Sequence, residues 1–294
     1  MAQGSITRTA INCIPPAVVA TIIAFWWLAP VGVASHPYML SALIIATLAM
    51  IQALEFVIER HPGWRINWTE FLTDAFYVAL GFTAIDYASQ HFGEDPLLRI
   101  KAHFHIATPW VEHLPFLVQV ALVITVIEFC QYWMHRAMHN WTPLWLTHAP
   151  HHHITQLNAL KGAVGNPIEL FLITLSVIAL FDVPPRALLC GFALLQVIPA
   201  FAHANLRADP PFWYAWFFTT VRHHSLHHSV PYEATRCNYA NSLILIDRIF
   251  GTFHEGEASV VGQDQRRRLS IVEQWAFPFM PLVALFRAQG TRSA

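Results

Sequence analysis

The N-terminal part of the chain contains a long interval without a charged side chain. No Asp, Glu, Lys or Arg occurs between Arg8 and Glu55. Within this interval, Ile14–Ala34 and Tyr38–Ile58 are each long enough to cross about 30 Å of hydrocarbon as α-helices. The interval therefore predicts two membrane spans, or one helical hairpin.

The composition agrees with a membrane protein. Charged residues make up 12% of the chain, hydrophobic residues 55%, and the mean hydropathy is +0.42, which is unusual for a soluble domain. A cleaved signal peptide is the alternative for Ile14–Ala34. That run is too long for a typical signal core, and more apolar runs follow it.

Four further apolar runs follow. They are Phe71–Tyr87, Leu114–Met134, Ile168–Val183 and Ala187–Ala204. The last two are joined by the prolines of Pro184–Arg186 and resemble a short or tilted helical hairpin. We predict an all-α integral membrane protein with four to six transmembrane helices and a cytosolic, histidine-rich catalytic cap.

The basic residues give an expected orientation. If all six runs cross and the N-terminus is cytoplasmic, the external loops hold only Arg99, Lys101 and Arg186, three of the 17 Lys and Arg residues. This asymmetry satisfies the positive-inside rule. If Phe71–Tyr87 does not cross, the N-terminus lies outside while the histidine-rich face stays cytoplasmic.

The runs suggest four parts of the chain. We expect an N-terminal transmembrane hairpin over 1–60, a third membrane segment and loop over 61–113, a catalytic domain over 114–255 and a tail over 256–294. In the tail, the run Trp275–Phe286 contains two prolines, which favours an interfacial segment over a span.

Two classes of interaction are disfavoured. The four cysteines are scattered, which speaks against a disulfide framework or a cysteine-based zinc site. The net charge is −1 with neutral histidines, and no basic stripe suits a phosphate backbone. We therefore expect no nucleic-acid partner.

Histidines are concentrated in clusters that suit metal binding. "HRAMH" holds one pair at the i, i+4 spacing of a single helix face, and "HAPHHH" and "HHSLHH" each contain H-x-x-H-H. A lone "HAN" at the end of the predicted hairpin adds His203. The candidate ligands are therefore His135, His139, His148, His151, His152, His203, His224, His227 and His228.

The number of imidazoles exceeds the needs of one ion. Two ions with four or five nitrogen ligands each could use all nine, and on a helix we expect the three nitrogens of each H-x-x-H-H triplet to converge on one region. Imidazole suits iron, zinc, copper and nickel, so the ligand set leaves the metal open. Nonspecific binding by a His-rich tract is disfavoured because the spaced clusters each abut a predicted membrane exit on one side.

The motifs resemble the fatty acid hydroxylase and sterol desaturase superfamily of membrane-bound non-haem di-iron oxygenases. The resemblance rests on the order H-x3-H, H-x2-H-H, H-x2-H-H and covers roughly Glu55 to Phe253. Further matching words are "NPIE" at Asn166–Glu169, "HAN" at His203–Asn205 and "NYANSLILIDRIFGTF" at Asn238–Phe253.

The resemblance implies two iron ions that use O2 to oxidise a C–H bond of a lipid drawn from the bilayer. Hydroxylases and desaturases both occur in the superfamily, so either product is open. Many members carry histidine where this chain has Asn166. Three roles for Asn166 are open: it binds a metal ion, it holds a metal-bound water, or its presence indicates a metal site that differs from that of those members.

Other polar residues near the motifs are candidates for supporting roles. Four could accept a proton from a ligand imidazole or bond a helix end: Glu128, Glu169, Asn205 and Asp247. His153 and His223 flank the triplets and are expected to lie outside the ligand set.

The chain has no recognisable electron-carrying motif. It lacks G-x-G-x-x-G, C-x-x-C-H and a run of cysteines, so we expect an external donor, a ferredoxin or a cytochrome b5-type carrier with its reductase. A metal transporter is the alternative from a different class, but its ligands should follow a path along the spans. A zinc protease is disfavoured because H-E-x-x-H is absent.

Overall fold

The computed structural model describes residues 8–281, and these fold as helices joined by turns and loops, with two isolated β-bridges. This confirms the all-α prediction. The α-helices are α2 (Ile14–Leu28), α3 (Val31–Ala34), α4 (Met39–Val57), α5 (Trp68–Leu80), α6 (Asp86–Ala88), α7 (Asp95–His103), α8 (Phe116–Asn140), α9 (Thr142–His152), α10 (Pro167–Leu172), α11 (Pro185–His203), α12 (Phe212–Phe217), α13 (Val221–His227), α14 (Ile244–Phe250) and α15 (Ile271–Ala276).

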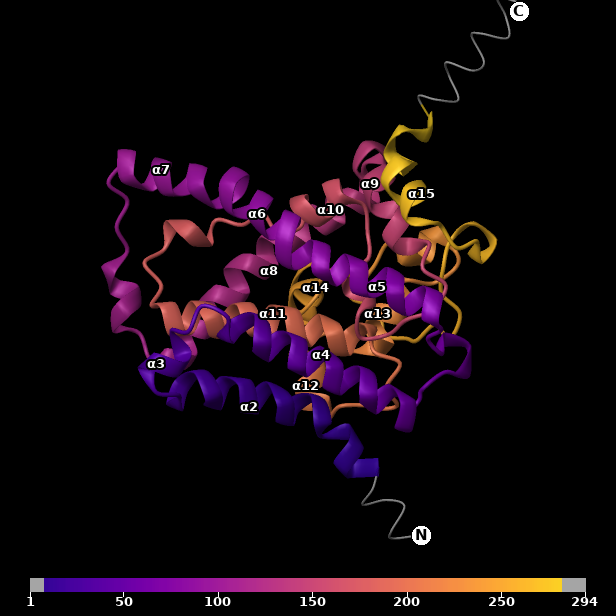
Figure 1. The fold of residues 1–294 in the computed structure, drawn as a ribbon, viewed down its shortest axis with the longest axis horizontal. Helices are drawn as coiled ribbons and strands as arrows, with labels where there is room; N and C mark the ends of the chain where they lie inside the picture. Colours follow the sequence, from indigo (N-terminus) through magenta and orange to yellow (C-terminus); the bar gives the residue numbers. More distant parts are fainter. Residues whose placement is uncertain (1–7, 282–294) are drawn as a thin grey trace, which may run out of the picture.

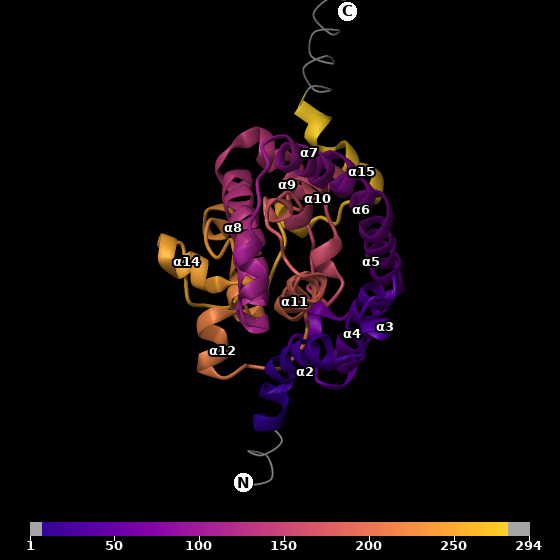
Figure 2. The ribbon, with the colours of Figure 1, turned by 90° about the vertical axis from the view of Figure 1, so that its left-hand side faces the viewer.

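The long helices form a bundle around α11. In Figure 1, α2, α4 and α11 lie side by side along the long axis of the molecule. Figure 2 looks along this axis and shows α11 in the interior, with α8 on one side and the indigo and purple helices on the other. Contacts of α11 with α8, α2 and α4 agree with this view.

Three of the described helices are long and apolar enough to cross a membrane, namely α4, α8 and α11. Helix α2 is apolar but has only 15 residues. These helices make the chain a multi-pass membrane protein, as predicted from the apolar runs. The run Phe71–Tyr87 lies in a helical stretch that continues from α5 to α7 through two π-helical segments, Gly81–Ile85 and Ser89–Glu94.

The predicted helical hairpin is wrong in its first arm. Only the second arm is a continuous helix, α11, whereas Ile168–Val183 breaks into α10, turns and the short 3-10 segment Ile178–Leu180. Near the end of α10, the Thr174 hydroxyl donates to the Phe171 carbonyl oxygen at 2.7 Å. Such local side-chain bonds compete with helix propagation, which apolar length alone does not reveal.

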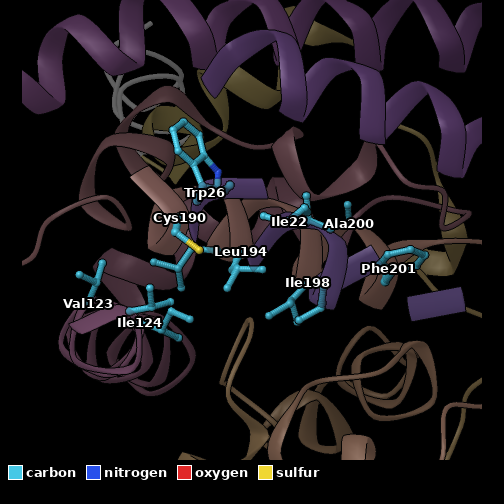
Figure 3. Close-up of a cluster of buried hydrophobic side chains, with 14 of the residues drawn as sticks. Ile22, Trp26, Val123, Ile124, Cys190, Leu194, Ile198, Ala200 and Phe201 are labelled. Carbon is cyan, nitrogen blue, oxygen red and sulfur yellow. The ribbon is translucent and has the colours of Figure 1, made fainter. Parts of the chain in front are cut away.

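Close packing of α8 on α11 sets the relative position of their ends. Gly191 of α11 lies so near Val123 that a Cβ there would come within 2.4 Å of the valine Cγ1. Small residues at helix contacts are what membrane helices use to approach one another. Figure 3 shows this region, where Val123 and Ile124 of α8 face Cys190 and Leu194 of α11.

Opposite ends of the bundle carry different polar contacts. At the end bearing α3 and the start of α8, Lys101 pairs with Asp182 at 2.7 Å and Arg186 donates to the Ala29 carbonyl oxygen. The histidine motifs lie at the other end, with α9, α13 and α15 (Figure 1). The three basic residues predicted for external loops are thus remote from the histidines along the chain's long axis.

A buried arginine joins the end of α4 to the C-terminal part. Arg60 pairs with Asp209 at 2.9 Å and with Glu257 at 2.6 Å, and His61 bonds the same Glu257 carboxylate. The hydrogen bond from Arg60 lowers the pKa of Glu257 to about 2. This carboxylate therefore connects the segment after α4 to residues beyond α14.

We predict that Glu257 contributes stability that depends on pH. A carboxyl whose pKa is lower in the folded state stabilises the fold fully above its unfolded pKa of about 4.5, and the contribution is lost as pH falls toward 2. Thermal unfolding should show Glu257→Gln less stable than the wild type at neutral pH, with the gap closing below pH 4.5. The matched control is Glu233→Gln, whose side chain is 78% exposed and should show little difference at any pH. A gap that persists unchanged at pH 2.5 would contradict this.

Candidate metal centre

Four helices bring the nine candidate histidines together. His135 and His139 lie near the C-terminal end of α8, and His203 ends α11. The second and third histidine motifs lie on α9 and around the end of α13. Helix α9 begins two residues after α8 ends, with a proline in its first turn, where proline is tolerated. All nine side chains are buried.

The nine candidate histidines form two clusters. Within each cluster the candidate ligand nitrogens lie within 4.8 Å of one another. The five-histidine cluster consists of His135, His139, His148, His152 and His227, and the four-histidine cluster consists of His151, His203, His224 and His228. Five and four imidazoles match the expectation of two ions.

The expected use of each triplet is wrong, because each H-x-x-H-H triplet is divided between the clusters. His148 and His152 serve the five-histidine cluster, while His151 between them serves the other. The α13 triplet does the reverse, giving only His227 to the five-histidine cluster. Residues four apart are about 40° apart around a helix, whereas the third-step residue points about 60° to the other side. The two triplets therefore face each other, and the rings of His152 and His228 stack with centroids 4.5 Å apart.

In four of the nine rings, a hydrogen bond to a backbone carbonyl fixes which nitrogen is free. Since a carbonyl oxygen can only accept, an Nδ1 bonded to one must carry the proton and leave a lone pair on Nε2. Four rings are held in this way by backbone carbonyls, His135 by Tyr239, His151 by Val164, His203 by Pro199 and His227 by Cys237, at 2.6–2.9 Å.

The Nε2 atoms point at one another. In the five-histidine cluster, the Nε2 of His148 lies 3.0–3.1 Å from the Nε2 atoms of His135, His139 and His152. In the other cluster, the Nε2 of His224 lies 2.9 Å from that of His203 and 3.1 Å from that of His228. Lone pairs that converge in this way repel unless a cation lies between them, so the residues fit two metal ions.

Burial keeps these imidazoles neutral. It lowers the pKa of His148 to about 3 and holds those of His224, His227 and His228 well below the usual range. A neutral imidazole is the form that binds metal. The sites are therefore ready for cations at physiological pH.

Among the proposed supporting carboxylates, Glu169 contacts a candidate ligand directly. Its Oε1 lies 2.8 Å from Nδ1 of His148, and burial raises its pKa to about 8. Asp247 acts one step away, since it accepts from the backbone amides of Tyr239 and Ala240 and Tyr239 in turn holds His135. Carboxylates that orient metal-binding histidines are common outside the ligand set.

The other two proposed residues bond backbone rather than histidine. Glu128 accepts from the amide of Ser242 at 2.9 Å, and Asn205 exchanges two bonds with the backbone of His61. Glu128, in the middle of α8, thus holds the turn before α14, and Asn205 holds the segment after α11 against the segment after α4.

Asn166 and the two flanking histidines have other partners. The Asn166 amide donates to the carbonyl oxygens of Gln274 and Trp275, and its oxygen accepts from Ile168 as the N-cap of α10. His153 donates to the Ala149 carbonyl oxygen. His223 lies 3.3 Å from the Thr220 hydroxyl. All three lie outside both clusters.

Sequence reasoning missed the residues that support the ligands through the backbone. Gly262 donates its amide to the His228 carbonyl oxygen and Gln263 to that of His152, at 3.1 and 3.0 Å. Glu55 accepts from the amides of Ala159 and Asn205 at 2.8 and 2.9 Å. Glu55 could have been noticed as the first charge after the uncharged interval, whereas Gln263 has no sequence signal.

Comparisons with known proteins agree with this site. The family model described as fatty acid hydroxylase matches residues 120–252. The ornithine lipid hydroxylase OlsE of Rhizobium tropici is 26% identical over 74% of this chain and 68% of its own length. Human alkylglycerol monooxygenase is 28% identical over 52% of this chain, which spans only 33% of that protein.

A third relative comes from another branch of lipid chemistry. The Delta(7)-sterol-C5(6)-desaturase of Nicotiana tabacum is 28% identical over 48% of this chain and 52% of its own. No solved structure matches the chain significantly. The matched region, residues 120–252, holds all nine histidines, and in this region the chain matches the fatty acid hydroxylase family.

Proposed function

We propose that the protein is a membrane-bound di-iron oxygenase that hydroxylates a C–H bond of a lipid. The observation that carries the proposal is the pair of buried histidine clusters, with five and four imidazoles, inside a fatty acid hydroxylase domain. When bound there, two iron ions would supply the redox chemistry in which one O2 is reduced with two electrons and two protons, one oxygen atom converts C–H into C–OH and the other leaves as water.

The position of the clusters suits a lipid substrate. His135, His139 and His203 end two of the membrane-length helices, α8 and α11. A hydrocarbon chain leaving the bilayer along these helices would meet the clusters without passing through water. The most fitting substrates are lipids with long acyl chains, and the similarity to an ornithine lipid hydroxylase favours an acyl chain over a sterol.

The chain's own residues would hold the ions and exclude solvent. Carbonyl oxygens of Val164, Pro199, Cys237 and Tyr239 fix the ring tautomers. The burial of the histidines would keep bulk water from the reacting carbon, which would protect an oxidising site from side reactions.

Desaturation is the second candidate, and the similarity to a sterol desaturase favours keeping it. Both reactions need the same ions, and the product alone distinguishes them. A metal transporter is a weaker candidate, because the clusters gather at one end of the bundle and do not follow a path along the spans (Figure 1).

We propose that the metal centre faces the cytoplasm. Arg99, Lys101 and Arg186 are the Lys and Arg residues assigned to the external loops, and the other Lys and Arg residues are assigned to the same side of the membrane as the histidines. Electrons would come from a separate ferredoxin or cytochrome b5-type carrier with its reductase.

The proposal predicts both a metal content and a product. The protein purified in detergent should hold about two iron ions per chain and, with a reductase, a carrier and O2, should add one oxygen, a mass gain of about 16 Da, to a lipid. A mass loss of about 2 Da would identify a desaturase instead. A wild-type protein that binds no transition metal after anaerobic loading with ferrous iron would contradict both.

A further inference from the structure

A short segment contacts one histidine cluster directly and the other through the carboxylate that supports it. It is Lys161–Asn166, "KGAVGN", which comprises a 3-10 turn and the N-cap residue of α10. None of its residues is a candidate metal ligand. Its two glycines are three residues apart. One lies against a histidine of the four-histidine cluster, and the other lies against Glu169, which contacts the five-histidine cluster.

Gly162 lies against the four-histidine cluster. A Cβ at this position would come within 3.3 Å of Nδ1 and 3.4 Å of Cε1 of His203. That ring has little room to retreat, because its Nδ1 is 2.9 Å from the Pro199 carbonyl oxygen and its Nε2 is 2.9 Å from the Nε2 of His224. Two residues later, the carbonyl oxygen of Val164 holds His151 of the same cluster.

Gly165 lies against the support of the five-histidine cluster. A Cβ here would come within 2.3 Å of Oε2 of Glu169, the carboxylate whose other oxygen is 2.8 Å from Nδ1 of His148. An alanine would therefore displace Glu169 from His148. The carboxylate is the free end of a flexible side chain, so it can move without disturbing the fold.

The segment is fixed at both ends. The buried Lys161 ammonium forms ion pairs with Glu70 and Asp74 of α5, the latter at 2.7 Å. At the other end, the Asn166 side chain donates to the backbone of Gln274 at 2.8 Å. A buried ion pair needs close, well-matched geometry to offset the desolvation of its charges, and this one joins α5 to the turn that carries Gly162.

We propose that the Lys161–Asn166 segment positions the two metal sites separately, the four-histidine site through Gly162 and Val164 and the five-histidine site through Gly165 and Glu169. This inference rests on one part of the proposed function, namely that both clusters bind metal. Gly162 and Gly165 are positioning residues, and each should affect one ion and spare the other.

The test counts ions in protein loaded anaerobically with ferrous iron and then exposed to a chelator for a fixed time. The wild type should retain about two ions per chain and Gly162→Ala about one. Gly165→Ala should still load two ions but release one of them about ten- to a hundredfold faster, the scale seen when a residue supporting a ligand is lost. The control is Gly63→Ala, where a Cβ meets nothing within 4 Å.

Double variants assign the ion that is lost. Adding Gly162→Ala to His224→Ala should cost nothing more, since the four-histidine site is already broken, whereas adding it to His135→Ala should remove the second ion. Retention of two ions by Gly162→Ala, or further loss in the His224→Ala background, would overturn the inference.

A milder variant decides the matter if circular dichroism shows that Gly162→Ala does not fold. Asp74→Asn leaves Lys161 paired with Glu70 but loosens the segment, and one ion should be released several-fold faster while the other is unchanged. Equal acceleration of both would overturn the inference. A wild type that loads two ions but yields no oxidised lipid would instead count against the proposed function alone.

Discussion

Replacing His224 with alanine should remove one metal ion and lower lipid oxidation by more than about a hundredfold. The Nε2 of His224 lies 2.9 Å from that of His203 and 3.1 Å from that of His228, so it is the central imidazole of the four-histidine cluster. Losing a ligand should cost more than losing the residue that orients one, which typically costs ten- to a hundredfold. Iron content and product formation by mass spectrometry measure the two effects.

His223→Ala is the matched control, one residue away in the same histidine-rich stretch. His223 is as buried as His224, but it faces the Thr220 hydroxyl and lies 3.6 Å from the Glu255 carboxylate. Its loss should lower the melting temperature and leave two ions in place, with activity within about tenfold of the wild type at a temperature where the variant is folded. If both variants lost an ion equally, the ligands of α13 would be assigned in the wrong register.

The sequence was sufficient to predict the nine histidines, because helix periodicity and the number of imidazoles are both local properties. The partners of each ring were not predictable. His151 joins His203 from α11, and His227 joins His135 from α8. These pairings depend on how four helices pack, which no motif states.

The supporting residues were harder to predict for a physical reason. Most of the groups that hold the rings are backbone carbonyls, such as that of Cys237. Every residue has a backbone carbonyl, so the residue type does not show which one holds a ring. Glu169 was predictable because its support is a side chain. The break after α10 was missed because Ile168–Val183 is apolar enough for a helix. Side-chain bonds such as that of Thr174, which compete with helix propagation, depend on local geometry.

Gly262→Ala should weaken both metal sites together, in contrast to the selective variants at Gly162 and Gly165. Gly262 and Gln263 bond the carbonyl oxygens of His228 and His152, one from each cluster, and the Gln263 side chain also donates to the Ser229 carbonyl oxygen at 2.8 Å. Gly262 has φ +108°, and a Cβ there would come within 2.8 Å of the Ile154 carbonyl oxygen. Backbone must therefore move, and the bonds to both triplets move with it.

The control for backbone strain alone is Gly251→Ala. Gly251 also has a positive φ, +70°, but a Cβ there meets nothing within 4 Å, so alanine should cost only the left-handed conformation, roughly 1–2 kcal/mol. Gly262→Ala should lower the melting temperature further and speed the release of both ions to a chelator, whereas Gly251→Ala should leave release unchanged. If Gly262→Ala and Gly251→Ala released the ions at the same rate, the bonds from Gly262 and Gln263 would stabilise the fold without positioning the histidines. The alignment of the two triplets would then depend on α9 and α13 alone.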